Sequence, residues 1–337
     1  MSLVNADVLR VVRLALDPPA DRIAEQDEAG FTWWPHAHAQ RIAASAARAD
    51  GACRVSAETV LLANVSGRGP ELAALAARNA RDAGLSSLRW DSERGEVSLR
   101  AAVIAHPGDG GGAARRLAHA ALLQLGEALR AAESLVLEFP GATLVTGRDV
   151  AGREWTSVDA TESWRAYAAQ APGASPVMSA AMQHLARLSP APWVRATPAA
   201  HGLDAEIACR AAQPEAVPGE GLALLRLSVS QPHPRLGAGF VSVLVLPPAA
   251  EPLAERAAAT AALLNEGESR EWTGADQLGG WCVHPAAGLA HALFLPAVAV
   301  EEDTLERLAW QAGIRARWAS QFLDRVAAMR ESGTAQA

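Results

Sequence analysis

Apolar residues follow a regular spacing that divides the first half of the chain into helices and strands. They recur every three or four positions over residues 4–16, 70–84 and 113–134, which predicts three amphipathic helices. Short runs rich in β-branched and aromatic residues predict strands between these helices. The strands are expected at 31–34, 40–44, 54–65, 87–91 and 96–105, with an extra strand at 136–145. The predicted order is therefore α-βββ-α-ββ-α.

The second half is predicted to repeat that order. Helices are expected at 176–188, 251–265 and 301–329. Strands are expected at 193–197, 203–209, 223–229, 239–246 and 289–295, with a short strand around Trp272. Alanine and leucine positions in the helices 70–84 and 251–265 coincide at an offset of 181, and Trp90 coincides with Trp272 at an offset of 182.

A period near 180 residues indicates two whole domains, since solenoid repeats are much shorter. We therefore expect an α+β protein with a first domain at 1–150 and a second at 176–337, each with an antiparallel sheet. Residues 151–175 depart from the pattern and contain Gly152, Pro172 and Gly173, which indicates a linker.

Net charge and composition exclude several kinds of catalysis and several kinds of partner. The net charge is −7, and all 30 basic residues are arginine. Without lysine, Schiff-base catalysis and the lysine of a phosphate-binding P-loop are excluded. An acidic chain has no general attraction for nucleic acid or for an acidic membrane, so neither is expected as a partner.

The cysteines and the N-terminal stretch indicate the cellular compartment in which the protein is expected. Cys53, Cys209 and Cys282 are far apart and form no C-x-x-C pair, which excludes zinc ribbons and thioredoxin-like motifs. Such a sparse, odd number of cysteines suits a reducing compartment. The N-terminal stretch lacks the apolar centre of a signal peptide, and the mostly apolar stretch 286–300 is too short to span a bilayer. We expect a soluble cytoplasmic protein.

Three features of the first half carry a resemblance to a known fold. They are the helix 70–84 between two groups of strands, the turn Ser92-Glu93-Arg94-Gly95, and the closing helix 113–134. With this element order, each half resembles the type III secretion chaperone fold and the related YbjN family. The resemblance implies a non-enzymatic protein whose domains pair as dimers and hold an extended segment of a partner along helix and sheet surfaces.

A tandem copy of such a domain would resemble a covalently fused dimer. The chain is therefore expected to be a monomer with an internal pseudo-dimer, or a homodimer, that binds a protein or peptide segment. The length of the chain, its extra strand and its ten tryptophans depart from those families. The identity of a partner does not carry over.

Tryptophans supply the candidate partner-binding residues. Trp33 and Trp34 are adjacent on a predicted strand, so one ring is expected in the core and the other at the surface. Trp310 and Trp318 belong to an apolar stripe in the last helix, at helical spacing. Exposed tryptophans frequently anchor protein interfaces, which makes these four the candidates. The alternative interpretation places the rings in the core.

Two pairs of residues offer weaker chemistry. His36 and His38 share a face of a strand and suit metal chelation or acid–base catalysis, but no third ligand occurs at a recognisable spacing. Cys282 and His284 also share a face, but no orienting acid or amide accompanies them. The common hydrolase, metalloprotease, EF-hand and P-loop motifs are missing. We therefore expect no catalytic residues, no metal and no cofactor.

A glycine-rich loop supports the alternative function. Gly108, Gly110 and Ala113 satisfy the relaxed G-x-G-x-x-A pattern between a strand and a helix, where backbone N–H groups can hold a phosphate. This predicts a nucleotide- or phosphometabolite-binding enzyme as the alternative to a protein-binding module. The chain lacks the alternating βα order of such enzymes. A further alternative is a structural scaffold that uses the last helix.

Overall fold

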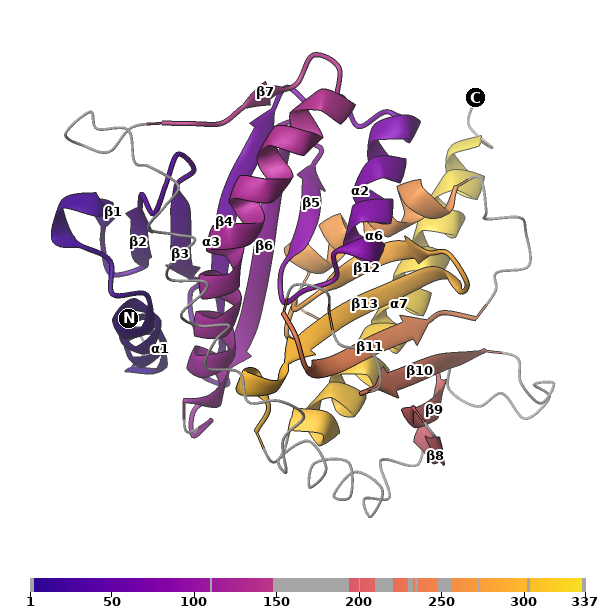
Figure 1. Ribbon diagram of the computed structural model, residues 1–337. Helices are drawn as coiled ribbons and strands as arrows, with labels where there is room; N and C mark the ends of the chain where they lie inside the picture. Colours follow the sequence, from indigo (N-terminus) through magenta and orange to yellow (C-terminus); the bar gives the residue numbers. More distant parts are fainter. Residues whose placement is uncertain are drawn as a thin grey trace.

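The computed structural model describes residues 3–109, 111–147, 194–199, 201–209, 221–229, 233, 236–247, 256–271, 273–301 and 304–334. These residues form two antiparallel sheets that are both covered by helices, which confirms the α+β class (Figure 1). The linker predicted at 151–175 and the helix predicted at 176–188 lie outside the described residues.

The first sheet comes from the N-terminal half. Its central pair is formed by β4 and β6, which run side by side from Cys53 opposite Ala105 to Leu62 opposite Val97. Alternate residues of β4 are buried, as expected for a strand with one face on the core. In order across the sheet, the strands are β1 (Ile23–Gln26), β2 (Gly30–Trp33), β3 (Gln40–Ala44), β4 (Cys53–Ala63), β6 (Glu96–Ala105) and β5 (Ser87–Asp91), with β7 (Thr143–Leu144) paired to the end of β4.

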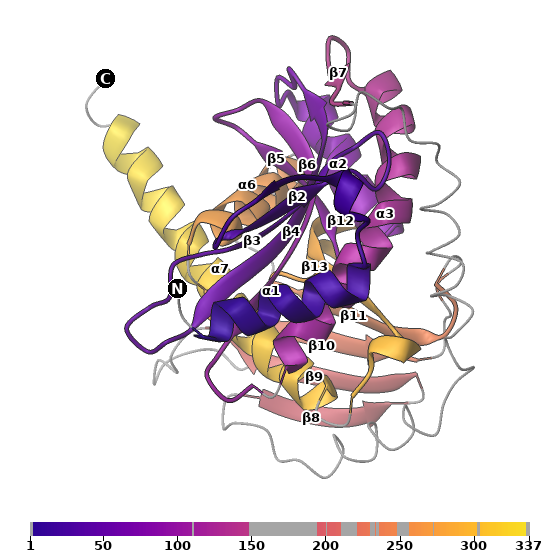
Figure 2. The same cartoon turned by 90° about the vertical axis from the view of Figure 1, so that its left-hand side faces the viewer.

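Three helices accompany this sheet. Helix α3 (Gly112–Glu138) lies along β4 and β6, and α1 (Leu3–Leu16) packs beside it (Figure 2). Helix α2 (Gly69–Arg81) has Pro70 in its first turn, where the missing N–H of proline costs nothing. Its Glu71 carboxylate accepts a hydrogen bond from the Arg68 N–H at 3.0 Å, which caps the helix.

The second sheet has the same strand order as the first. From the outer edge, its strands are β8 (Val194–Ala199), β9 (Gly202–Ala208), β10 (Leu222–Ser228), β11 (Gly239–Val245), β13 (Gly288–Pro296) and β12 (Gly280–His284). Helix α6 (Ala257–Arg270) precedes β12, and α7 (Thr304–Thr334) follows β13 and packs on β9, β10 and β11. Each half thus places four strands, a helix, two strands and a long helix in the same order.

The two halves pack through their helices α2 and α6, which lie side by side between the sheets (Figure 1). Helix α2 packs on β12 of the other sheet and on β5 of its own, and α6 packs on β12 and β13 of its own sheet and on β5 of the first. A β-bridge between Ala102 and Gln277 joins the halves further. One hydrophobic cluster therefore contains residues of both sheets.

The structure corrects four sequence expectations. The extra strand at 136–145 is wrong, because α3 continues to Glu138 with Leu135 buried, and β7 has only two residues. Strand β1 was not expected, since Ile23–Gln26 contains a single β-branched residue. Helix α6 begins and ends later than expected, so the offset of 181 does not align it with α2. The strand after α6 begins at Gly280, and Trp272 lies outside the described residues.

Candidate functional site

The adjacent pair Trp33 and Trp34 does not form an exposed anchor. Trp33 is buried in the core, and its indole N–H donates to the Gln40 side chain at 3.0 Å. Trp34 is half-buried, and its ring lies so close over Gly147 that a Cβ atom at this glycine would collide with it. The expectation that one of the two rings lies in the core is met by Trp33. The expectation that Trp33 binds a partner is therefore wrong.

The two tryptophans of α7 differ from each other. Trp318 is buried, stacks on Phe322 at 5.1 Å between ring centroids and donates to Glu271 at 2.8 Å. Trp318 is therefore a packing residue, and the expectation that it anchors a partner is wrong. Trp310 is 51% exposed and is the one tryptophan of the four predicted anchors that offers a large surface. The C-terminal end of α7 extends away from the rest of the protein (Figure 2).

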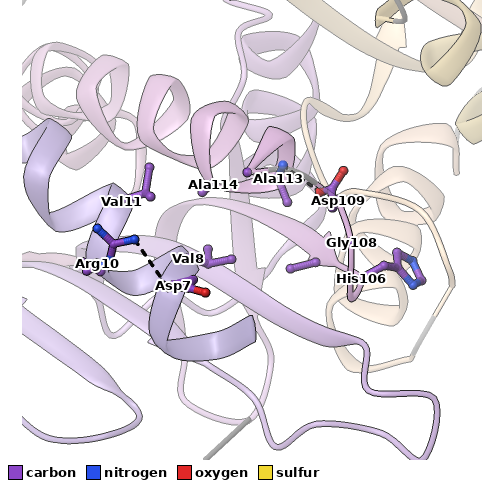
Figure 3. Close-up of a pocket in the computed structure, with 11 residues that line it drawn as sticks. Asp7, Val8, Arg10, Val11, His106, Gly108, Asp109, Ala113 and Ala114 are labelled. Atoms are coloured by element: carbon purple, nitrogen blue, oxygen red, sulfur yellow. Dashed lines mark hydrogen bonds and ion pairs between the residues drawn. The ribbon is translucent and has the colours of Figure 1, made fainter. Parts of the chain in front are cut away.

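The glycine-rich loop borders a cleft of about 380 Å³ between α1 and the start of α3 (Figure 3). Gly108 adopts a φ of 88°, which favours glycine, whereas Gly110 lies outside the described residues. The N–H of Ala113 donates to the Asp109 carboxylate at 2.8 Å. A carboxylate of the chain therefore stands at the helix N-terminus, in the position that the alternative function would give to a phosphate.

Asp109 is held there by arginines from two elements. Its carboxylate lies 3.8 Å from the Arg116 guanidinium and 3.5 Å from that of Arg307. Arg116 also forms an ion pair at 2.9 Å with Asp276 of the second half. These cations are already compensated by carboxylates of the chain, which reduces their attraction for a phosphate.

The predicted histidine pair is buried beneath the segment that follows β7. The His38 ring contacts the Val145 carbonyl at 2.8 Å through Nδ1, and the His38 N–H donates to Nδ1 of His36 at 3.1 Å. Burial, followed by repulsion from His38, lowers the pKa of His36 to about 3. Within the described part of the chain, no group of three or more metal-ligating side chains is present.

The predicted Cys282 and His284 pair also has no catalytic geometry. Cys282 is fully buried on β12, and this burial raises the pKa of its thiol to about 12. A thiol with such a pKa supplies no thiolate nucleophile near neutral pH. His284 is half-exposed, and its Nδ1 accepts from the Ala286 N–H at 3.3 Å. Cys282 is therefore a packing residue of β12, and His284 stabilises the turn that follows this strand.

Two asparagines occupy matching places in the contact between the halves. Asn79 of α2 binds both backbone groups of Leu88 on β5: it accepts from the N–H at 2.8 Å and donates to the carbonyl at 2.9 Å. Asn265 of α6 binds both backbone groups of Trp281 on β12 at 2.9 Å each. Strands β5 and β12 are sheet edges, so each asparagine satisfies the backbone of an edge strand.

A layer of buried polar side chains lies around α6, and it was not expected from the sequence. Arg89 is 4% exposed and donates to the Asn265 carbonyl at 3.0 Å and to the Ser269 hydroxyl. Arg54 donates to the backbone carbonyls of Ser269 and Glu271. Two arginines of the first sheet thus bind the C-terminal turn of a helix of the second half, the negative end of its dipole.

The same layer contains a buried ion pair within the second half. Arg315 of α7 lies 2.8 Å from Glu268 of α6, and Glu268 is fully buried. Arg315 also donates to the Asp276 backbone carbonyl. His291 of β13 is buried beside this pair, and desolvation lowers its pKa well below the usual value. We call this set of Arg54, Arg89, Glu268, Trp281, His291 and Arg315 the polar layer.

The outer face of the second sheet forms a hollow of about 940 Å³. Its floor is apolar: Leu224 of β10 is 55% exposed, and Val241 and Val243 of β11 are half-buried. Its rim carries both charge signs, with Asp204 bound to Arg226 at 2.9 Å. We call this surface the open face. Contiguous exposed apolar surface with a polar rim is typical of interaction sites.

Neither the polar layer nor the open face is predicted from the sequence. The predicted helix ends at residue 265, before Glu268, and the strands predicted for the second half do not include the range of β12, which carries Trp281. Buried and more exposed positions alternate along β9, β10 and β11. The sequence signal for the open face is the matching alternation of apolar and polar residues in β9, GLDAEIA.

Within the described residues, no helix is both long and apolar enough to cross a membrane. Comparison of the chain with family models, with curated proteins and with solved structures found no match.

Proposed function

We propose that the chain is a non-enzymatic protein-binding module made of two fused homologous domains, which binds an extended segment of a partner protein. The observation that carries the proposal is that α2 and α6 pack on each other and that each of them contacts the edge strands β5 and β12 of both sheets. A two-fold dimer of one domain would place each copy's helix on the other copy's edge strand. The identical strand orders and the matching bonds of Asn79 and Asn265 support an origin of the chain from two fused copies of one domain.

The matched bonds also give a register between the halves. They relate Leu88 of β5 to Trp281 of β12 and therefore Arg89 to Cys282. The offset between the two asparagines is 186, not the 181 expected from the helix sequences. In this register the type III secretion chaperone and YbjN resemblance applies to a pseudo-dimer within one chain.

The open face is the surface that we assign to the partner segment. Leu224, Val241 and Val243 line an apolar floor, and Arg195, Glu206 and Arg226 lie around it. An extended segment with alternating apolar residues places one row of side chains on such a floor. The paired charges of the rim favour a partner without a large excess of either sign.

A photo-crosslinking amino acid at position 224 tests this assignment. The matched control carries the same residue at position 137, where Leu137 is exposed on α3 and lies outside the open face. We expect one defined polypeptide to crosslink at 224 and not at 137. A synthetic peptide from the crosslinked stretch should then bind the purified protein. Its binding should be lost in Leu224→Asp and retained in Leu137→Asp.

Equal crosslinking at both positions would contradict the open face as the site. Retained peptide binding in folded Leu224→Asp would contradict it as well. The scaffold alternative predicts association through α7, and Trp310→Ala would then abolish the partner contact while Leu224→Asp leaves it intact.

A further inference from the structure

A short segment of the first half closes over two buried histidines. We call residues 143–147 the strap; they follow α3 and include β7. The first part of the strap pairs with the end of β4, where Leu62 lies opposite Leu144. Its last part is bound to the loop 34–39, which connects β2 with β3. The strap is therefore held by two separate sets of contacts.

The loop holds the strap through His38 and its neighbours. The His38 ring binds the Val145 carbonyl through Nδ1 at 2.8 Å, and the Gly147 N–H donates to the Ala37 carbonyl at 3.0 Å. The Trp34 ring covers Gly147 so closely that a side chain at this position would collide with it. All three contacts depend on the conformation of the loop.

Hydrogen bonds fix the position of the proton on each histidine ring. The His38 N–H donates to Nδ1 of His36 at 3.1 Å, so this nitrogen carries a lone pair and the proton of neutral His36 is on Nε2. On His38 the order is reversed. Because the Val145 carbonyl can only accept, Nδ1 of His38 carries the proton. The two neutral rings are therefore opposite tautomers.

This difference makes His36 the acid-sensitive member of the pair. A second proton on His36 is placed on Nδ1, where it points at the His38 N–H and removes the acceptor of that bond. A second proton on His38 is placed on Nε2 and leaves the bond to Val145 intact. His36 is only 1% exposed, so its ring cannot take up the second proton without a movement of the loop.

Burial keeps both rings neutral at neutral pH in spite of their charged neighbours. The rings lie edge to face with centroids 5.6 Å apart, so two charged rings would repel each other. Arg22 donates to the Pro35 carbonyl of the same loop at 3.4 Å, and Glu133 of α3 raises the pKa of His38. The strap contains no titratable side chain. Desolvation outweighs these groups and lowers the pKa of His36 and of His38.

We propose that His36 and His38 form an acid-operated latch. While His36 is neutral, the latch holds the strap to the loop 34–39. When His36 takes up a proton from the solvent, the loop loses its internal bond and releases the last part of the strap. In the released state both rings meet water and bind protons more readily, so acid favours release before the closed structure itself is protonated. The latch belongs to the first sheet and depends neither on the open face nor on the proposed function.

Hydrogen exchange followed by NMR tests the latch through the amide protons of His38, Val145 and Gly147. Their protection factors, which remove the pH dependence of the chemical exchange step, give the equilibrium constant for release. The test variant is His36→Asn. Its side-chain oxygen lies as many bonds from Cα as Nδ1 of histidine, so it keeps an acceptor that cannot be protonated.

The variant isolates the contribution of His36 to release. Between about pH 5.5 and pH 4.5, the release constant of the wild-type protein should rise about tenfold more than that of His36→Asn, because the open state binds one more proton at His36. The matched control is His106→Asn, at an exposed histidine outside the latch. It should respond to pH like the wild-type protein.

An equal rise in the wild-type protein and in His36→Asn overturns the proposal. Equal protection of the strap amides and of the Val103 amide, on the central strand β6, would also overturn it, because opening would then be global unfolding. The tautomers give a test with the wild-type protein alone, which serves if His36→Asn does not fold. Long-range ¹H–¹⁵N spectra at neutral pH should show the His36 proton on Nε2 and the His38 proton on Nδ1. A proton on Nδ1 of neutral His36 rules out the latch.

Discussion

Asn265 accepts the backbone N–H of Trp281 and donates to its backbone carbonyl, both at 2.9 Å. Through this one side chain, α6 is fixed to the edge strand of its own sheet while its other side lies against the first half. Asn79 does the same for Leu88 on β5. These two side chains align the two helices that form the contact between the halves.

Replacing Asn265 should therefore be costly. Asn265→Ala leaves two buried backbone groups of Trp281 without partners, and each costs about 1–3 kcal/mol. Urea denaturation should show a loss of about 2–5 kcal/mol in the free energy of unfolding. Asn79→Ala should give a similar loss. A loss below about 0.5 kcal/mol for either variant would show that the bonds are not retained in solution.

The buried pair of Glu268 and Arg315 should show strong coupling. Glu268→Gln or Arg315→Met alone leaves a buried charge unpaired and should destabilise the protein by about 3–5 kcal/mol. The double variant should be less destabilised than the sum of the single variants, since neither charge is then left alone. A double-mutant cycle by chemical denaturation measures the difference. Simple additivity would argue against the ion pair.

Acid should destabilise the protein through His36. Its pKa is about 3 in the folded protein and 6.5 in the ordinary environment of an unfolded chain. Between these values the unfolded state binds more protons, so the contribution of His36 to stability is fully present above pH 6.5 and is lost as the pH falls to about 3. In His36→Gln, the melting temperature should fall less steeply over this range. An unchanged slope would assign the acid sensitivity to other groups.

Asp109 should act as a cap of α3 and as a counter-ion. Asp109→Ala removes the acceptor of the Ala113 N–H and the carboxylate beside Arg116. We expect a loss of about 1–2 kcal/mol in the free energy of unfolding, typical of a lost N-cap with a dipole contribution. Asp109→Asn keeps an acceptor and should lose less. The wild-type protein should show no thermal stabilisation by a panel of nucleotides, whereas a clear shift would restore the nucleotide-binding alternative.

Much of the fold was accessible from hydrophobic spacing. Strands β3, β5 and β6 match their predicted bounds, since alternating residues between turn signals define them well. Helix α1 is predicted within one residue of its start, Leu3. Strand β1 escaped prediction because its pairing with β2, and not its own residue types, makes it a strand. The end of α3 escaped prediction because Leu135 packs in a cluster with Leu61 and Leu72, which are distant in the sequence.

The candidate sites are harder to predict from the sequence than the fold. A pattern of tryptophans does not show which ring is covered. Trp33 and Trp318 are both buried, and the Trp318 N–H binds Glu271, 47 residues away in the sequence. Arg89 lies within a predicted strand, and the Asn265 carbonyl of α6 that binds it is 176 residues away in the sequence. The burial of a charge by a distant element cannot be derived from local spacing.

The placement of α2 and α6 within one polypeptide changes the thermodynamics of their pairing. Two separate subunits would meet in a bimolecular step, so their stability would fall on dilution. Here the encounter is intramolecular, at an effective concentration set by the connecting chain. The protein should therefore unfold at one temperature regardless of its concentration. Under the proposed origin from two copies of one domain, fusion also releases the two helices from the identity that a homodimer imposes, so that the surroundings of α2 and α6 can differ.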